Sequence, residues 1–225
     1  DGQTLPAYFE RHSKKYRAYN YGVQGYGTNH QLALLEKHDF SKEITEKDGV
    51  GFYLYMYDHV YRALGDVFWV NRDEWAQSPY YKIHAGKAVY SGSFRSGRRL
   101  LTMVYRAINI ITKWAEQSRN FPAKLGPRQY EYEAKLLRSM AEAYAQKFGN
   151  DNFYVVIHPL HLQSRDIVPY LEKYNIKYIN LDYLMPDYTY YDDNMILLDG
   201  HPNALLNEKI AQELVLFIKQ RIMYK

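Results

Sequence analysis

Residues 197–203 read Leu197-Leu198-Asp199-Gly200-His201-Pro202-Asn203, and the predicted fold is built outward from this stretch. An apolar run stops here, and an acid and an imidazole follow two positions apart. Pro202 suits the first turn of a helix, and the Asn203 side chain can accept a hydrogen bond from a free backbone N–H there. The pattern predicts a helix over residues 204–223, because apolar residues recur at helical spacing. These residues are Leu205, Leu206, Ile210, Leu214 and Ile218.

The pair Asp199 and His201 has two interpretations. A histidine beside a carboxylate can act as a general base at neutral pH. An Asp-x-His sequence before a helix is also typical of a turn that only caps the helix, because short motifs often occur without chemistry. The stretch alone does not decide between them.

Composition excludes several classes of protein. The chain has 225 residues, 47% of them hydrophobic, which suffices for one well-buried domain over residues 1–225. A formal net charge of +4 is too small to indicate nucleic-acid binding. The chain has no cysteine, which excludes disulfides, zinc thiolates and thiol catalysis. No cofactor and no metal is predicted, and the sequence does not indicate an oligomeric state.

The location of the protein in the cell is not indicated. No apolar run is long enough to span a bilayer. The sequence begins at Asp1 without a methionine, so an exported or membrane-anchored protein with an N-terminal leader or anchor fits as well as any other.

Strands and helices alternate along the chain, which predicts a three-layer α/β/α sandwich with a parallel sheet. Residues 65–97 interrupt the alternation and are expected to form an insertion or lid on the site side, with a β-hairpin around Ala85-Gly86-Lys87. The expected strands are residues 17–23, 51–57, 152–157 and 176–181. The expected helices, besides the last one, are residues 5–16, 31–37, 98–119, 127–147 and 166–174.

Tyrosine is common, with 25 residues. Its flat apolar face and polar tip suit sugar surfaces and interfaces. A composition biased toward tyrosine without a specific role explains the count equally well.

Three short segments of the sequence, taken in their order along the chain, form a recognisable pattern. They are the glycine turn at residues 22–28 (Gly-Val-Gln-Gly-Tyr-Gly-Thr), the strand end at residues 55–58 and the stretch at residues 199–203. Their order and spacing resemble the SGNH (GDSL) hydrolase family over nearly the whole chain. The resemblance implies a flavodoxin-like parallel sheet and a Ser-His-Asp hydrolase acting on esters. It implies His201 as the base, Asp199 as the acid that orients it, and the backbone N–H of Gly25 as an oxyanion-hole donor.

The chain departs from the family at three points. No Gly-Asp-Ser occurs, and residues 1–6 resemble the segment directly after that motif in family members, so the serine and the first strand are expected upstream of Asp1. Tyr57 stands where the family has the Asn of the oxyanion hole, which makes Tyr57 the candidate second donor. The short Asp-x-His spacing resembles the polysaccharide O-acetyltransferase-type members.

The absent first strand leads to a structural expectation. In a 2-1-3-4-5 strand order, the first strand separates the strands at residues 17–23 and 51–57. Without it, buried backbone groups on both neighbours would lack partners. Direct pairing of these two strands would therefore contradict the resemblance.

Three further residues are candidates for substrate binding: Asn29 after the glycine turn, Asp58 at a strand end, and His158 after a central strand. For Asp58, the pattern favours a helix cap with Arg62 as an ion-pair partner. For His158, it favours a structural hydrogen bond. His158, His161 and Asp166 could surround a metal on a helix, but Pro159 argues for a loop, and no metal is expected.

The sequence thus predicts a serine ester hydrolase of the acylesterase or lipase-like type, acting on a small-molecule, lipid or carbohydrate ester. Two alternatives stay open. The same triad could transfer an acyl group onto a sugar hydroxyl, or the chain could be a non-catalytic binding module that has lost its nucleophile.

Overall fold

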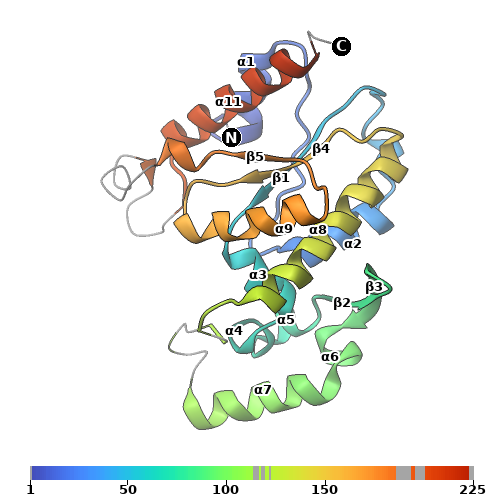
Figure 1. The fold of residues 1–225 in the computed structure, drawn as a ribbon, viewed down its shortest axis with the longest axis vertical. Helices are drawn as coiled ribbons and strands as arrows, with labels where there is room; N and C mark the ends of the chain where they lie inside the picture. The colour runs from blue at the N-terminus through green and yellow to red at the C-terminus, as the bar shows by residue number, and fades with distance from the viewer. Residues whose placement is uncertain are drawn as a thin grey trace. The chain divides into compact units, whose positions relative to one another are not determined.

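The computed structural model describes residues 2–113, 117, 120–121, 123–185, 194–195 and 201–222. The fold class is mixed α/β, with a three-stranded parallel sheet (Figure 1). The chain forms two compact units, a smaller one from Asp1–Val23 and Leu181–Lys225 and a larger one from Gln24–Asn180. The expected single domain over residues 1–225 stays a prediction.

The sheet of the larger unit contains β1 (Gly51–Tyr55), β4 (Phe153–Ile157) and β5 (Tyr178–Asn180), in the order β1-β4-β5. All three strands are parallel, with β1 in register with β4 over its full length. β4 is buried at every position, as expected for a central strand with both faces covered. The predicted strands at residues 51–57 and 176–181 are confirmed in type, but both are shorter than expected.

One face of this sheet carries the core of the larger unit. Tyr53 pairs with Val155 and Tyr55 with Ile157, and paired residues point to the same face of a sheet. Four helices supply the other side of this core, namely α2 (Thr28–Lys37), α3 (Asp58–Leu64), α8 (Pro127–Phe148) and α9 (Val168–Lys173). Figure 1 shows α8 and α9 lying across the strands.

The ends of α8 follow from its sequence. The helix starts at Gly126-Pro127, where the fixed φ of proline suits the first turn. It ends before Gly149, whose φ of 71° is the left-handed conformation that glycine adopts most easily. Both ends were predicted.

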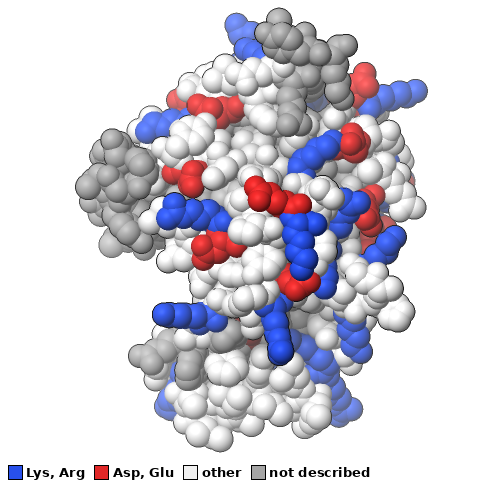
Figure 2. All heavy atoms as spheres, in the orientation of Figure 1, with Lys and Arg blue, Asp and Glu red and all other residues white. Residues whose placement is uncertain are grey.

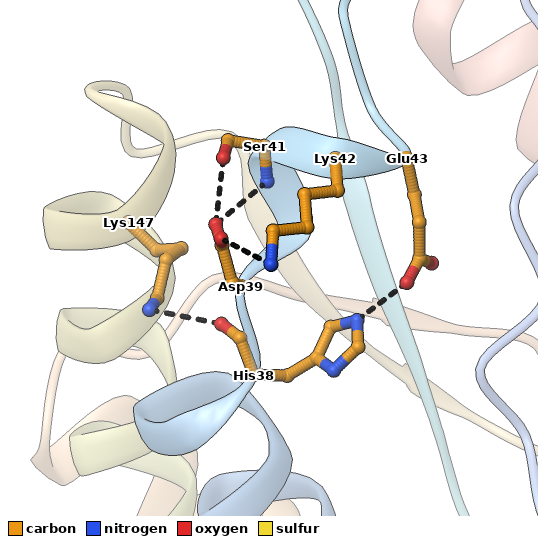
Figure 3. A network of polar contacts seen from close by, with 6 residues as sticks. All are labelled: His38, Asp39, Ser41, Lys42, Glu43 and Lys147. Carbon is orange, nitrogen blue, oxygen red and sulfur yellow. Dashed lines mark hydrogen bonds and ion pairs between the residues drawn. The ribbon is translucent and has the colours of Figure 1, made fainter.

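The end of α2 is tied to α8 by a polar network (Figure 3). Lys147 Nζ donates to the His38 carbonyl at 3.1 Å, and the His38 ring lies 2.7 Å from Glu43 Oε1. Asp39 Oδ1 accepts from the backbone N–H and the hydroxyl of Ser41. These contacts fix the turn that leads into the short 3-10 helix η1 (Phe40–Lys42).

Residues 65–97, the expected insertion, contain the predicted hairpin, formed by β2 (Pro79–His84) and β3 (Lys87–Ser93). Ala85 and Gly86 make the turn, both with positive φ, as two-residue hairpin loops require. Three short helices accompany the hairpin, namely α4 (Val67–Val70), α5 (Asp73–Ala76) and α6 (Phe94–Gly97). α7 (Arg99–Thr112) follows, and residues 114–116 and 118–119 of the helix predicted over 98–119 lie outside the described residues.

The smaller unit pairs α1 (Leu5–Ser13) with α11 (Ala204–Ile222) and includes the 3-10 helix η3 (Asp182–Leu184). His12 Nε2 lies 3.0 Å from Glu208 Oε1, which links the two helices. Four of the five predicted apolar positions of α11 are buried, but Leu205 is 47% exposed. No helix among the described residues is long and apolar enough to cross a membrane.

The strand predicted at residues 17–23 is wrong, because this segment has no regular structure. Asn20 Oδ1 accepts the N–H of Gly22 at 2.9 Å, a side-chain turn that competes with an extended ladder. Val23 is 51% exposed, so the segment also lacks the buried face that would fix a strand. The predicted arrangement of two strands flanking an absent first strand therefore stays untested.

Candidate functional site

His201 is exposed and lies three residues before the start of α11. The residues that follow it are held by backbone contacts. Pro202 forms an isolated antiparallel bridge with Met195, and the Asn203 N–H donates to the Asn194 carbonyl at 2.9 Å. Asn203 Oδ1 accepts the N–H of Leu206 at 3.0 Å, which confirms the predicted helix cap. Asp199 and Gly200 lie outside the described residues, so the Asp199–His201 pair stays a prediction.

The other candidate residues belong to the larger unit. Tyr57, Asp58 and His158 follow the carboxyl ends of the neighbouring strands β1 and β4. The N–H of His158 donates to the Tyr55 carbonyl at 2.9 Å, which extends the ladder one step past both strands. Tyr57 and Asp58 therefore leave the sheet beside His158. Open α/β sheets place their binding sites at this edge.

His158 has a structural hydrogen bond, as the sequence favoured. Its Nδ1 accepts the N–H of Leu160 at 3.1 Å, and its side chain is buried. Burial, with a smaller effect of His161, lowers the pKa of His158 to about 3, so the ring is neutral at pH 7. The bond to Leu160 places the remaining ring proton on Nε2.

Asp58 is the first residue of α3, where a carboxylate is stabilised by the positive end of the helix dipole. The expected ion pair with Arg62 is absent from the described residues. Arg62 Nη1 donates instead to the Tyr26 carbonyl at 2.8 Å. Asp58 Oδ2 lies 4.0 Å from His161 Nε2, and both side chains are partly exposed. The sequence had suggested His161 only as part of a metal cluster.

The backbone N–H and the hydroxyl of Tyr57 both form hydrogen bonds within the larger unit. Its N–H donates to Ser164 Oγ at 3.0 Å, and its hydroxyl lies 2.9 Å from the Tyr61 hydroxyl. An oxyanion donor at Tyr57 would therefore be the phenol rather than the backbone. Its role in an oxyanion hole stays a prediction.

Gly25 lies in the turn that precedes α2, with a φ of 79° that favours glycine. The ring of Trp75, from α5 of the insertion, packs against it so closely that a Cβ at position 25 would overlap the ring. The insertion therefore lies on the glycine turn. No acceptor among the described residues is bonded to the Gly25 N–H, and its oxyanion role stays a prediction.

The rest of the glycine turn is held by two side chains. The Gly27 N–H donates to His30 Nδ1 at 3.2 Å, and the His30 ring stacks on Tyr26 with centroids 4.5 Å apart. Burial, helped by the charge of Arg62, lowers the pKa of His30 to about 4, which keeps it a neutral acceptor. These contacts and the Arg62 bond tie the turn to α2 and α3.

A pocket of about 600 Å³ opens between α2 and the insertion. Tyr26, His30 and Trp75 give it aromatic walls, and Lys37 and Glu74 add one charge of each sign. The pocket is adjacent to the glycine turn. None of the predicted site residues that the structure describes lines it.

Asn29 is fully buried, and its Nδ2 donates to the Pro79 carbonyl at 2.7 Å. This bond joins the start of α2 to the start of β2. Its Oδ1 has no hydrogen-bond partner among the described residues. The contacts indicate a structural role, and the predicted substrate contact has no support from this conformation.

Sequence reasoning missed a buried polar chain behind the glycine turn. It links Glu133 of α8, Thr28 of α2, Tyr53 of β1 and His59 of α3. Burial raises the pKa of Glu133 to about 8 and lowers that of His59 well below its usual value. The sequence did carry a signal, because Glu133 interrupts the apolar stripe of α8 at a position one turn after Tyr130 and one turn before Leu137.

Comparisons with protein-family models, with curated proteins and with solved structures found no match to this chain. Among the described residues, no group of three His, Asp or Glu side chains could hold a metal ion. The candidate functional residues are therefore His201 in the smaller unit, and those of the glycine turn and the strand ends in the larger one.

Proposed function

We propose that this protein is a serine ester hydrolase, in which His201 is the general base and Asp199 orients it. The proposal requires a serine nucleophile N-terminal to Asp1, because the sequence contains no Gly-Asp-Ser. The acyl acceptor is water, and the substrate is a carboxylic ester of a small molecule, a lipid or a carbohydrate. The family resemblance of residues 22–28, 55–58 and 199–203 suggested this class.

One observation carries the proposal, namely the way the chain presents His201. The residue is exposed, while the bridge between Pro202 and Met195 and the hydrogen bond from the Asn203 N–H to the Asn194 carbonyl hold the residues on its C-terminal side. A base must be accessible to its substrate and fixed in position, because general-base catalysis needs hydrogen-bond contact with the proton that is removed.

The proposed reaction has two steps. The serine oxygen attacks the ester carbonyl carbon while His201 accepts the hydroxyl proton, and the collapsing intermediate expels the alcohol, which takes that proton. Water then attacks the acyl-serine, again giving its proton to His201, and the acid is released as serine is restored. The N–H of Gly25 is the proposed donor to the oxyanion, and one such donor contributes about 3 kcal/mol.

The remaining features of the proposal concern the fold. The parallel order β1-β4-β5 is what strands three to five of a 2-1-3-4-5 sheet would give. A three-layer, flavodoxin-like architecture is therefore proposed, with residues 65–97 as an insertion that contacts the glycine turn through Trp75.

A second candidate function is acyl transfer to a carbohydrate hydroxyl. The pocket beside the glycine turn favours it, because Tyr26 and Trp75 offer the flat apolar faces on which sugar rings stack. The Asp-x-His spacing of Asp199 and His201 points the same way. In this reaction, the sugar hydroxyl replaces water in the second step.

The test measures hydrolysis of p-nitrophenyl acetate by the protein carrying its natural N-terminal residues. His201→Ala should lower kcat by about a thousandfold or more, because the base of such a triad carries most of the rate. His84→Ala is the matched control, since His84 is an exposed histidine of the β2–β3 hairpin. Equal rates for wild type and His201→Ala would overturn the proposal.

A second assay separates the alternatives. A fluorophosphonate probe should label one serine of the active protein, and mass spectrometry of the labelled peptide locates it. Absence of both labelling and turnover would leave the non-catalytic binding module. Acyl-sugar formation at the expense of free acid, with a sugar acceptor present, would identify the transferase.

A further inference from the structure

α7 turns its apolar side outward. With 100° between successive residues, the apolar residues of α7 occupy one half of the helix circumference. Leu100 is 77% exposed, Ile110 79% and Ile111 82%. Leu101, Met103 and Val104 are also exposed large hydrophobic residues of this half. We call these six residues the α7 apolar face.

The opposite, polar half of α7 holds the helix on the protein. Thr102 is buried and its hydroxyl donates to the Phe94 carbonyl at 2.8 Å. Arg106 Nη2 lies 2.5 Å from Asp73 Oδ1, an ion pair with the first residue of α5. A surface helix normally packs its apolar stripe on the core. α7 does the reverse, so its exposed face is fixed in orientation by specific polar contacts.

The segment around α7 is strongly basic. Residues 75–115 contain seven Lys and Arg and no Asp or Glu. The formal charge of this segment is therefore larger than the net charge of +4 of the whole chain. Arg98 is largely buried beside Phe94, but Arg95, Arg99 and Lys82 are exposed. Figure 2 shows an uncharged surface at the bottom of the view, where α7 lies, with Lys and Arg side chains at its borders.

We propose that the α7 apolar face lies in the surface of an anionic lipid membrane, with the neighbouring arginines and lysines on the lipid headgroups. An exposed half-apolar helix flanked by cations is the composition of helices that lie in the membrane interface. The fourteen residues of α7 give a contact about 21 Å long. A membrane needs no complementary shape, whereas a large exposed apolar face otherwise requires a matching partner surface.

A second copy of the chain suits this surface less well. In a two-fold dimer, the same patch meets itself, so the basic borders of α7 would face each other. Residues 75–115 have no acid to pair with them, and like charges in contact weaken association. An acidic partner protein would satisfy the charges, and vesicle binding distinguishes it from a membrane. The inference does not depend on the proposed hydrolase activity.

The experiment is co-sedimentation of the full chain with vesicles of phosphatidylcholine alone or mixed with phosphatidylglycerol. We expect binding to the anionic vesicles, weakened by added salt because surface charges are screened. The double substitution Ile110→Asn and Ile111→Asn should lower the vesicle affinity by about tenfold or more, because two apolar side chains leave the lipid. The matched control is Leu205→Asn with Leu216→Asn, two exposed leucines of α11.

A charge variant tests the second half of the proposal. Arg99→Gln should weaken binding to anionic vesicles by about fivefold, whereas Arg165→Gln, an exposed arginine of η2 (Leu162–Ile167), should not. Unchanged thermal unfolding of each variant shows that the fold is retained.

Three results would overturn the proposal. Binding to neither vesicle would exclude a lipid surface and leave an acidic protein. Equal binding to both vesicle types would show that anionic headgroups do not contribute to binding. Sedimentation of the wild type as a dimer that the double isoleucine substitution makes monomeric would identify a second copy as the occupant.

Discussion

The hydroxyl of Thr28, the first residue of α2, donates a hydrogen bond to Oε1 of the buried Glu133 carboxyl group in α8. Since Thr28 has one proton to give, its oxygen accepts from the Tyr53 hydroxyl at 2.8 Å. Tyr53 in turn accepts from His59 Nδ1 at 2.7 Å. One chain of hydrogen bonds therefore joins α8, α2, β1 and α3 directly behind the glycine turn.

We predict that Glu133 makes the stability of the protein depend on pH. Burial raises its pKa from 4.5 to about 8, and the second carboxylate oxygen has no partner among the described residues. The folded state therefore keeps a proton that the unfolded state has lost. The stabilisation is complete below pH 4.5 and is lost as the pH rises through about 8, by at most about 1.4 kcal/mol per pH unit.

Urea unfolding near pH 4.5 and near pH 8 tests this prediction. Glu133→Gln should remove the part of the slope that Glu133 contributes, so the variant gains stability relative to wild type as the pH rises. Asp66, whose pKa burial raises to about 7, acts in the same direction in both proteins and cancels in the comparison. Glu10→Gln, an exposed control on α1, should leave the slope unchanged. Equal slopes for Glu133→Gln and wild type would exclude a buried titrating carboxylate.

Thr28→Val should destabilise the larger unit, although it hardly changes the volume of the side chain. The substitution leaves Glu133 Oε1 and the Tyr53 hydroxyl buried without this partner, which costs about 1–3 kcal/mol. Thr28→Ser keeps the hydroxyl and should cost much less. The free energy of unfolding of the two variants is the measurement, and a similar loss in both would show that the hydrogen bonds of the Thr28 hydroxyl are not the main cause.

Local signals in the sequence predicted much of the fold. Pro127 and Gly149 marked the ends of α8, the two-residue turn at Ala85 and Gly86 marked the hairpin, and the apolar run of β4 marked a central strand. Each of these depends on backbone preferences or burial that neighbouring residues determine. At residues 17–23, polar residues alternate with apolar ones as in a strand, but none of these residues is buried. The sequence of the segment does not reveal this lack of a buried face.

The candidate site was predictable only in part. Asn203 caps α11 as expected, because a cap is a contact between near neighbours. The packing of Trp75 on Gly25, fifty residues earlier, depends on how the insertion folds back. Apolar periodicity predicted the helix at residues 98–119 but not that the polar half of α7 faces the protein, because periodicity does not say which side of a helix is inside.

We predict that Gly25→Ala lowers the stability of the folded protein, for two reasons that can be tested separately. A left-handed backbone costs a residue with a Cβ about 1–2 kcal/mol, and the new methyl group would overlap the Trp75 ring. Gly86→Ala is the matched control, because Gly86 has a similar φ of 82° but no heavy atom within 4 Å of the added Cβ. We therefore expect thermal unfolding to show a larger loss for Gly25→Ala than for Gly86→Ala.

A double-mutant cycle with Trp75→Ala isolates the steric part. If Trp75 causes the excess cost, removing its ring should return Gly25→Ala to the cost of Gly86→Ala. An excess that persists without the ring would mean that the glycine turn is fixed by the contacts of Arg62 and His30 rather than by the insertion.

Asp199→Asn tests whether the acid next to His201 is catalytic. In a Ser-His-Asp triad, the carboxylate holds the imidazole in the tautomer that accepts the serine proton, and the Asn substitution lowers kcat by about ten-thousandfold. We expect a loss of this order in p-nitrophenyl acetate hydrolysis by the protein with its natural N-terminal residues, with unchanged thermal unfolding. Asp193→Asn removes a nearby acid of the same tyrosine-rich segment and should retain activity. Full activity of Asp199→Asn would show that His201 acts without Asp199 as an orienting acid.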